Sequence, residues 1–563
     1  MKVLIFSGGS GSDALQTGLY EKYPELDITI LLNGFDNGKS TGAIRQVFDG
    51  EILGPSDVRK NQTRQYALKN GFDDVYTFIE HRFTSDKPIE YIRSYYSELS
   101  ENSLLTQLMR IVEDYFAEVP ASKNIEYVDF SIGNIIYGHL AHLGNNSLQA
   151  AADHMRELLE IDQEVILNSD ESLFLQATTL SGKTLRDEAD IVDFANNEDT
   201  ITGIHFLRPD GSKTHTSSLC QRAIDAIEDA DLIIFSTGTQ WSSLIPTYQC
   251  DPENGKSFTE IISEAQSKKY FIINGAPDKD MYGYDGDGIL DVVGTYFDVK
   301  DTQIISGKTR MQPIRYDALV ETLNTTGHPE AYNPEILACT IMSLYFGQPK
   351  PTDTFIFDWD DTIQGRRGTF AEESKENKRI LPTDSIIVTG NTHHKVDLKN
   401  IPCFANGGVS VYHDGAFLRH LDDDVVLTKE VQDVVTQFLH DFGFNQSMLQ
   451  NRGDVCLSIK PLISEYRSMA AHILNKELPE DWKAEITGKT TVDIKHLKNH
   501  KIVAVQHIMN SKPKGKVFYI GDELDGGNDQ IIEKNKHLYN IRTVPVNNPK
   551  DTLTFLKTVM RST

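Results

Sequence analysis

Cysteine is scarce in this 563-residue chain, and the five cysteines present form no CxxC pair. Their scattered positions argue against a disulfide framework and against a zinc site, and they fit a reducing compartment. Long apolar runs are also missing, since none approaches the roughly 18 residues that a membrane-spanning helix needs. We therefore expect a cytoplasmic protein with no membrane partner.

Positive charge is in short supply, because 55 lysine and arginine residues face 82 aspartate and glutamate residues, giving a net charge of −27. This balance disfavours nucleic acid as a partner, since nucleic acid needs basic surface. A small phosphorylated substrate remains compatible with it, because a bound metal ion or a few cationic side chains reverse the field locally. The length exceeds what one hydrophobic core supports, so we expect several domains.

Short apolar runs alternate with helical patterns along the whole chain, as in "KVLIF", "ITILL", "DLIIF", "TFIFD" and "KVFYIGD". Such runs, ending in Gly, Asp, Ser or Thr, are typical of parallel strands whose carboxyl ends carry ligands. The fold class predicted is therefore α/β throughout. The proline-containing stretch "FGQPKPTD" at 346–353 predicts a linker between domains at 1–347 and 352–563.

The stretch "FIFDWDDT" carries a predicted strand directly into Asp358 and Asp360. A carboxylate such as Asp358 can attack phosphorus and form an aspartyl-phosphate, which splits one difficult step into two. Asp360, two residues on, is a candidate to protonate the leaving oxygen and then to activate water. An ordinary acidic loop is the alternative interpretation of these residues alone.

Three later stretches also place polar residues at predicted strand or helix ends. Thr389 is a candidate hydrogen-bond donor to a phosphoryl oxygen, and Lys501 is a candidate to neutralise its charge. A solvated helix face is the alternative for Lys501. Asp522 and Asp529, with the two aspartates above, are candidate ligands of Mg²⁺, which prefers oxygen ligands and would offset the repulsion between the acids.

These elements in this order resemble the haloacid-dehalogenase-like (HAD-like) phosphatases, and "GDELDGGND" is similar to their phosphomannomutase and sugar-phosphate phosphatase branch. The resemblance implies a Rossmann-like sheet domain over 352–563 with an inserted α+β cap at about 410–495. It also implies that Arg366 or Arg367 contacts substrate. Asp361 stands where the family commonly has glycine, and a non-catalytic copy stays an alternative.

Near the N-terminus, "FSGGSGSD" follows the first predicted strand and opens a helix. Gly8, Gly9 and Gly11 let the backbone approach an anion, and the helix N-terminus offers free N–H groups. The pattern is neither a Walker loop nor the dinucleotide GxGxxG spacing, and a plain tight turn is its alternative.

Later stretches add hydroxyl, amide and cationic groups and two acids. Asp36 and Asp57 are candidate ligands of a divalent metal. The candidate phosphate-binding residues are Ser40, Thr41, Arg45, Arg59, Asn134, Gly238 and Thr239.

Together the stretches "GGSGS", "DNGKSTGAIR", "GPSDVR", "SIGN" and "STGTQWSSLIP" resemble the 2-phospho-lactate transferase (CofD-like) and gluconeogenesis-factor family over about 1–320. The resemblance implies a Rossmann-like parallel sheet that either transfers a phosphorylated group from a nucleotide-diphosphate-linked donor with Mg²⁺, or binds a UDP-sugar as a regulator. Asn37, Lys39 and Ser56 depart from the family pattern. Trp241 and Tyr248 are candidate aromatic contacts, with a core position as the alternative.

The leading hypothesis is a bifunctional cytoplasmic enzyme, in which an N-terminal transferase acts on a nucleotide-diphosphate-linked metabolite and a C-terminal phosphatase acts on a small, sugar-like phosphate. The alternative is a nucleotide or UDP-sugar sensor attached to a phosphatase, and a third reading is a pseudo-phosphatase scaffold. The oligomeric state, with a homodimer among the options, stays open.

Overall fold

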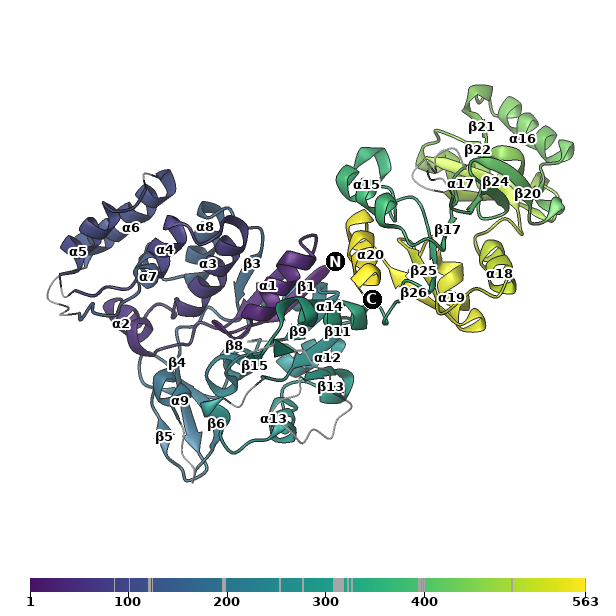
Figure 1. Cartoon of the computed structure of the whole chain (residues 1–563). Helices are drawn as coiled ribbons and strands as arrows, with labels where there is room; N and C mark the ends of the chain where they lie inside the picture. The colour runs from purple at the N-terminus through teal and green to yellow at the C-terminus, as the bar shows by residue number, and fades with distance from the viewer. Residues whose placement is uncertain are drawn as a thin grey trace. The chain divides into compact units, whose positions relative to one another are not determined.

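The structure is a computed structural model that describes residues 1–561 except 86, 101, 120–122, 124, 195–198, 253–254, 276–277, 307–317, 321–323, 326–327, 393–395, 397, 399 and 488–489. The chain divides into two compact units, Met1–Ile341 and Met342–Thr563 (Figure 1). This division falls within helix α14 (Pro334–Tyr345), just before the expected linker. Among the described residues, no helix is both long enough and apolar enough to cross a membrane.

The first unit is built on a parallel sheet that has seven strands within the described residues, in the order β13-β12-β11-β9-β1-β2-β3. Its central strands are buried almost throughout, which explains their continuous apolar sequences. The strands are β1 (Lys2–Phe6), β2 (Asp27–Leu32), β3 (Glu164–Leu167), β9 (Leu232–Phe235), β11 (Lys268–Ile272), β12 (Gln303–Ser306) and β13 (Ala318–Val320).

Helices and smaller sheets complete the first unit, among them a four-stranded antiparallel sheet and the two-stranded sheets β8–β10 (Ser217–Ser218 and Cys250–Asp251) and β14–β15 (Asn324–Thr325 and His328–Tyr332). Helix α6 (Ser103–Glu118) shows the usual reason for its formation, because its buried residues recur every three to four positions. The other helices include α1 (Asp13–Lys22), α2 (Lys39–Val47), α3 (Ser56–Asn70), α4 (Asp74–Glu80), α5 (Pro88–Tyr96), α7 (Ile132–Leu143), α8 (Leu148–Leu158), α10 (Gln221–Asp229), α12 (Phe258–Glu264) and α13 (Gly286–Val293).

The antiparallel sheet has the order β5-β4-β6-β7 and carries the short helix α9 (Glu188–Val192) between two of its strands. It brings residues from the middle of the unit toward the loop after β2, since Asn37 hydrogen-bonds both β4 and α9. Its strands are β4 (Phe174–Thr179), β5 (Thr184–Leu185), β6 (Ile201–Leu207) and β7 (Lys213–Thr214).

The second unit has a sheet in the order β20-β19-β18-β17-β16-β25-β26. Five neighbouring strands, β18, β17, β16, β25 and β26, pair in parallel, and the hairpin β19–β20 is antiparallel. Helices α15 (Ala371–Ile380), α18 (Ile502–Asn510), α19 (Gln530–Tyr539) and α20 (Pro549–Arg561) belong to it. The strands are β16 (Thr354–Phe357), β17 (Ser385–Val388), β18 (Cys403–Ala405), β19 (Ser410–His413), β20 (Ala416–His420), β25 (Val517–Gly521) and β26 (Ile541–Pro545).

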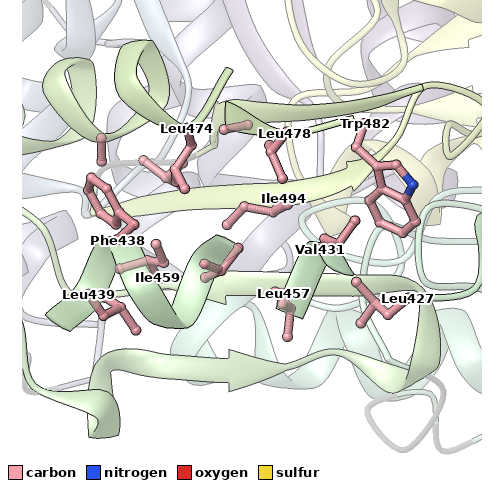
Figure 2. Close-up of a cluster of buried hydrophobic side chains, with 14 of the residues drawn as sticks. Leu427, Val431, Phe438, Leu439, Leu457, Ile459, Leu474, Leu478, Trp482 and Ile494 are labelled. Atoms are coloured by element: carbon pink, nitrogen blue, oxygen red, sulfur yellow. The ribbon is translucent and has the colours of Figure 1, made fainter. Parts of the chain in front are cut away.

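A cap is inserted between β20 and α18, and it consists of a four-stranded sheet, β21-β22-β24-β23, with two helices. Side chains from these helices and strands converge on one apolar cluster (Figure 2). The cap elements are α16 (Lys429–Asp441), β21 (Leu449–Asn451), β22 (Cys456–Ile459), α17 (Ser464–Glu477), β23 (Trp482–Thr487) and β24 (Thr491–His496).

The connection between cap and main sheet differs in one detail from the expectation. The hairpin β19–β20 pairs with the main sheet, so the cap begins after β20 and not at residue 410. Where the chain enters and leaves the cap, Lys498 Nζ lies 2.8 Å from carboxylate oxygens of both Asp422 and Asp424. The two parallel sheets and the inserted cap confirm the predicted α/β class.

Candidate functional site

Three neighbouring strands of the second unit end at the predicted polar residues. Asp358 directly follows β16, Thr389 follows β17, and Asp522 follows β25. Because these strands are parallel and adjacent, their carboxyl ends share one edge of the sheet. Lys501 and Asp529 stand at the N-termini of α18 and α19, so all five residues reach this edge.

Lys501 is the cation of this cluster, which corrects the alternative of a solvated helix face. Its side chain is 2% exposed, and its Nζ lies 2.8 Å from Asp358 Oδ1 and 2.6 Å from Asp529 Oδ1. Burial lowers the pKa of Lys501, but the two carboxylates outweigh burial and raise it above its usual value. Lys501 is therefore a fixed ammonium group beside the candidate nucleophile.

The three carboxylates of Asp358, Asp522 and Asp529 each place an oxygen within 4.8 Å of the others. Burial and the negative charges of Asp529 and Glu523 raise the pKa of Asp522 to about 6. Burial raises the pKa of Asp358 well above its usual value, despite Lys501. When all three carboxylates are ionised, one lysine offsets only one of their three negative charges.

The donor set fits a divalent cation. Asp529 Oδ2 is buried and has no hydrogen-bond partner. Mg²⁺ would balance the negative charge of the carboxylates that Lys501 does not offset. Thr362 Oγ1 donates to Asp522 Oδ1 at 3.3 Å and so orients this carboxylate. Asp360, expected among the metal ligands, is not in this group of described residues.

Asp360 instead hydrogen-bonds Asn391, which the sequence analysis did not single out. Asn391 Nδ2 donates to Asp360 Oδ2, and Asn391 N donates to Thr389 Oγ1 at 3.0 Å. The stretch "TGN" after β17 therefore holds both the candidate acid–base group and the candidate phosphate-binding hydroxyl. Its asparagine was missed because only a strand-end hydroxyl was sought there.

Asp361 has φ of 54°, the left-handed conformation that glycine adopts at no steric cost. Its carboxylate accepts a hydrogen bond from Arg366 N at 3.0 Å and lies 2.9 Å from Arg366 Nε. Arg366 Nη2 also lies 3.7 Å from Glu523 Oε1. The side chain of Arg367 lies outside the described residues.

In the first unit, the glycine turn between β1 and α1 packs closely against two other segments. A Cβ on Gly11 would lie 2.5 Å from Gly238 Cα, and a Cβ on Gly9 would lie 2.5 Å from Asp57 Oδ1. A Cβ on Gly8 would lie 2.7 Å from Ser243 Cβ. The glycines thus bring the β1–α1 turn, the N-terminus of α3 and the loop after β9 together.

A third acid joins Asp36 and Asp57. Burial, then the charges of Asp36 and Asp57, raise the pKa of Glu188 to about 8. Burial and Asp57 likewise raise the pKa of Asp36 to about 6. Lys60 Nζ lies 3.4 Å from Asp57 Oδ1 and offsets part of this charge. Glu188 was missed because it reaches the site from the separate antiparallel sheet.

Arg45 does not lie where a phosphate clamp is needed, which corrects the sequence expectation. It is fully buried, and its guanidinium donates to the backbone oxygens of Phe35, Asp36, Ile52 and Leu173 and to a serine hydroxyl. These five bonds use all five N–H donors of the group. Arg45 therefore fixes the turn that carries Asp36.

The structure brings Arg59, Asn134 and Ser40 together. Arg59 Nε donates to Asn134 Oδ1 at 3.1 Å, and Asn134 Nδ2 donates to Ser40 Oγ at 3.3 Å. Arg59 also forms an ion pair with Glu80, so part of its charge is already balanced. Thr41 is buried and hydrogen-bonds Asp36, so it positions this acid.

The loop after β9 is held from β11. Asn274 accepts from Gly238 N at 2.9 Å and donates to Gly238 O at 2.8 Å. Thr239 Oγ1 donates to Ser243 Oγ at 2.9 Å. Asp280 Oδ2 accepts from Trp241 N at 2.9 Å, at the start of the helical segment that follows.

The sequence matches the family described as 2-phospho-L-lactate transferase CofD over residues 3–316, more than half of the chain. The chain belongs to this family. A gluconeogenesis factor from Listeria innocua is 25% identical to this CofD-family chain over 277 residues, which are 48% of this chain and 66% of that protein. The chain thus spans just under two thirds of that relative. The Bacillus subtilis gluconeogenesis factor is 23% identical over 273 residues, 48% of this chain and 67% of its own length.

Two solved structures resemble the CofD-family chain more distantly. A Bacillus halodurans protein, described as a member of the UPF0052 family, aligns with 60% of this chain and 98% of its own, at 17% identity and a TM-score of 0.44. The C-terminal domain of Candida albicans trehalose-6-phosphate phosphatase aligns with 39% of this chain and 96% of its own, at 15% identity and a TM-score of 0.30. Scores in this range establish no close relationship.

One departure of this CofD-family chain from the family pattern now has a structural account. Asn37 Oδ1 accepts from Glu188 N at 2.8 Å, so the asparagine that replaces the family's second acid fastens the helix that supplies another carboxylate. Lys39 is exposed at φ of 42°. Tyr248 packs against Phe6 and Phe235 in the core, and Trp241 is also buried, so neither offers a free aromatic face.

Proposed function

We propose that the second unit is a Mg²⁺-dependent phosphatase that hydrolyses a small phosphate monoester through an aspartyl-phosphate. The observation that carries this proposal is the buried contact of Lys501 with Asp358 and Asp529, beside Asp522, at the carboxyl ends of parallel strands. A purely structural ion pair has no need of two surplus carboxylates at a sheet edge. The HAD-like order of these residues supports the same function.

In the first step, an oxygen of Asp358 attacks phosphorus and the bond to the leaving oxygen breaks. Asp360 gives its proton to that oxygen, and Asn391 holds the Asp360 carboxyl for this transfer. In the second step, Asp360 takes a proton from water, and the water oxygen attacks phosphorus. Inorganic phosphate leaves and the carboxylate of Asp358 is restored.

Charge on the phosphoryl group is met from two sides. Lys501, at the N-terminus of α18, and the hydroxyl of Thr389, after β17, lie at the same sheet edge as Asp358. A divalent cation held by Asp358, Asp522 and Asp529 would supply further charge neutralisation when bound. The inserted cap beside this sheet edge would select the substrate, for which we propose a small, sugar-like phosphate.

We further propose that the first unit binds a nucleotide-diphosphate-linked metabolite and transfers its phosphorylated part to an acceptor hydroxyl. The CofD-family match and the convergence of the glycine turn with Asp36, Asp57 and Glu188 support this. These acids would hold Mg²⁺ on a diphosphate. The second candidate, a non-catalytic nucleotide or UDP-sugar sensor, is favoured by the similarity to gluconeogenesis factors and by Asn37 in place of an acid.

The phosphatase is tested with the full chain, p-nitrophenyl phosphate and Mg²⁺. We expect hydrolysis that EDTA abolishes and that Asp358→Asn lowers by at least about 10³-fold, because the two side chains have nearly the same shape but the amide is not a nucleophile. Unchanged melting temperature is the control for folding. Absence of turnover in the wild type across pH 5–9 would contradict the phosphatase proposal and favour the pseudo-phosphatase scaffold.

The transferase is tested in the Asp358→Asn chain, in which phosphatase activity cannot obscure the products. Nucleotide-diphosphate-linked donors are incubated with this variant and Mg²⁺, and release of nucleoside monophosphate is measured together with binding by calorimetry. Release supports the transferase, and Asp36→Ala should reduce it. Tight binding without release, with a panel of acceptors present, would support the sensor instead.

A further inference from the structure

Asp529 is held by two donors that both reach the same oxygen. Tyr519 OH donates to Asp529 Oδ1 at 2.6 Å, and Lys501 Nζ lies 2.6 Å from that atom. The other oxygen, Oδ2, is buried and has no hydrogen-bond partner. The carboxylate therefore presents one saturated oxygen and one oxygen with its lone pairs unused.

Tyr519 belongs to β25, where its side chain is fully buried. Its hydroxyl is the donor of the bond to Asp529, because a carboxylate oxygen can only accept. Gly521 lies two residues on, and a Cβ there would meet Asp529 Oδ2 and lie 3.0 Å from the ring of Tyr519. The absence of a side chain at 521 leaves room for Oδ2 at the sheet edge.

We propose that Tyr519 is a positioning residue for the divalent-cation site of the second unit. By sharing Asp529 Oδ1 with Lys501, it fixes the rotation of the carboxylate and leaves Oδ2 available to a cation. This inference rests on the phosphatase function proposed above. Among the described residues, the hydrogen bond of the Tyr519 hydroxyl goes to Asp529, so the effect of removing this hydroxyl should appear in metal affinity and not in the chemical step.

The test compares Tyr519→Phe with the wild type in the full chain. The substitution removes only the hydroxyl and keeps the ring that packs beneath the site. We expect the Mg²⁺ concentration for half-maximal hydrolysis of p-nitrophenyl phosphate to rise about tenfold or more. The maximal rate at saturating Mg²⁺ should stay within about threefold of the wild type, because Lys501 and Asp358 are untouched.

A direct binding measurement accompanies the kinetics. Free Mn²⁺ is followed by electron paramagnetic resonance as the protein is added, and Asp522→Asn identifies which binding phase belongs to the second unit. Tyr519→Phe should weaken that phase by a similar factor and leave other phases unchanged. Tyr137→Phe is the matched control, since Tyr137 is an equally buried phenol that donates to Gln62 at 2.7 Å in the first unit.

The outcomes separate this inference from the proposed function. Wild-type Mg²⁺ dependence and Mn²⁺ affinity in Tyr519→Phe would overturn the positioning role while leaving the phosphatase intact. A fall in maximal rate that saturating Mg²⁺ does not restore would also overturn it. If the wild type hydrolyses nothing, the phosphatase fails, and the Mn²⁺ titration still decides whether Tyr519 supports the cation site.

Discussion

Replacing Lys501 with methionine should destabilise the second unit strongly in metal-free buffer. The lysine makes its two contacts, at 2.6 and 2.8 Å, with carboxylates that are almost fully buried. Removing one partner of a buried ion pair costs about 3–5 kcal/mol, because the charge left behind has no compensation. For a unit of this size, each kcal/mol lowers the melting temperature by about 2–4 °C, so a drop of about 6–20 °C is expected.

The loss should also depend on pH and on Mg²⁺. Burial already raises the pKa of Asp358 in the folded wild type, and loss of the lysine raises it further, so the variant loses more stability than the wild type as pH rises. The deficit should therefore be larger at pH 8 than at pH 5.5, and Mg²⁺ should restore more stability to the variant than to the wild type.

Differential scanning calorimetry in EDTA and in Mg²⁺ measures these effects on the full chain. Lys498→Met is the matched control, because Lys498 is exposed, and it should shift the transition little. A Lys501→Met variant that melts within 2 °C of the wild type in EDTA at both pH values, a margin of roughly 1 kcal/mol or less, would refute the buried ion-pair network.

Three further predictions follow from the other contacts. Glu188→Gln should stabilise the metal-free protein relative to the wild type, increasingly as pH rises from about 4.5 to 8 and by up to about 5 kcal/mol. The reason is that the folded wild type holds a proton that the unfolded chain has lost. Denaturation midpoints that are equal for variant and wild type at both pH 5 and pH 8 would contradict it. Gly521→Ala should push Asp529 from its position and raise the Mg²⁺ requirement for hydrolysis, checked by a Mg²⁺ titration; an unchanged titration would show that the carboxylate has room to move. Arg45→Lys should lower stability by about 2 kcal/mol or more, seen as an earlier melting transition, whereas wild-type stability with weakened nucleotide binding would restore the phosphate-clamp reading.

Strand ends were the reliable signal in the sequence. Asp358, Thr389 and Asp522 each follow a short apolar run, and parallel strands necessarily bring such positions to one edge. The role of Lys501 was less certain from the sequence, because the neighbouring lysines are typical of an exposed helix face. Only the fold shows that it points inward to Asp358.

The residues that were missed or misread depend on burial and on distant segments. Glu188 comes from helix α9, between two strands of the separate antiparallel sheet, and no local pattern links it to Asp36. Tyr519 lies within an apolar strand and looks like an ordinary core residue until its hydroxyl is seen to reach Asp529. Arg45 follows a Ser-Thr-Gly run that suggests phosphate binding, but its guanidinium turns into the protein and binds backbone oxygens.

Two chain segments connect the sheet domain to the cap, and ion pairs of Lys498 with Asp422 and Asp424 join these segments at the protein surface. Dissolved electrolyte screens exposed charges of this kind, whereas it does not weaken the apolar packing inside the cap. Rising ionic strength should therefore loosen the tether while each body stays folded. If the proposed phosphatase admits its substrate by opening the cap, its turnover should then depend on ionic strength.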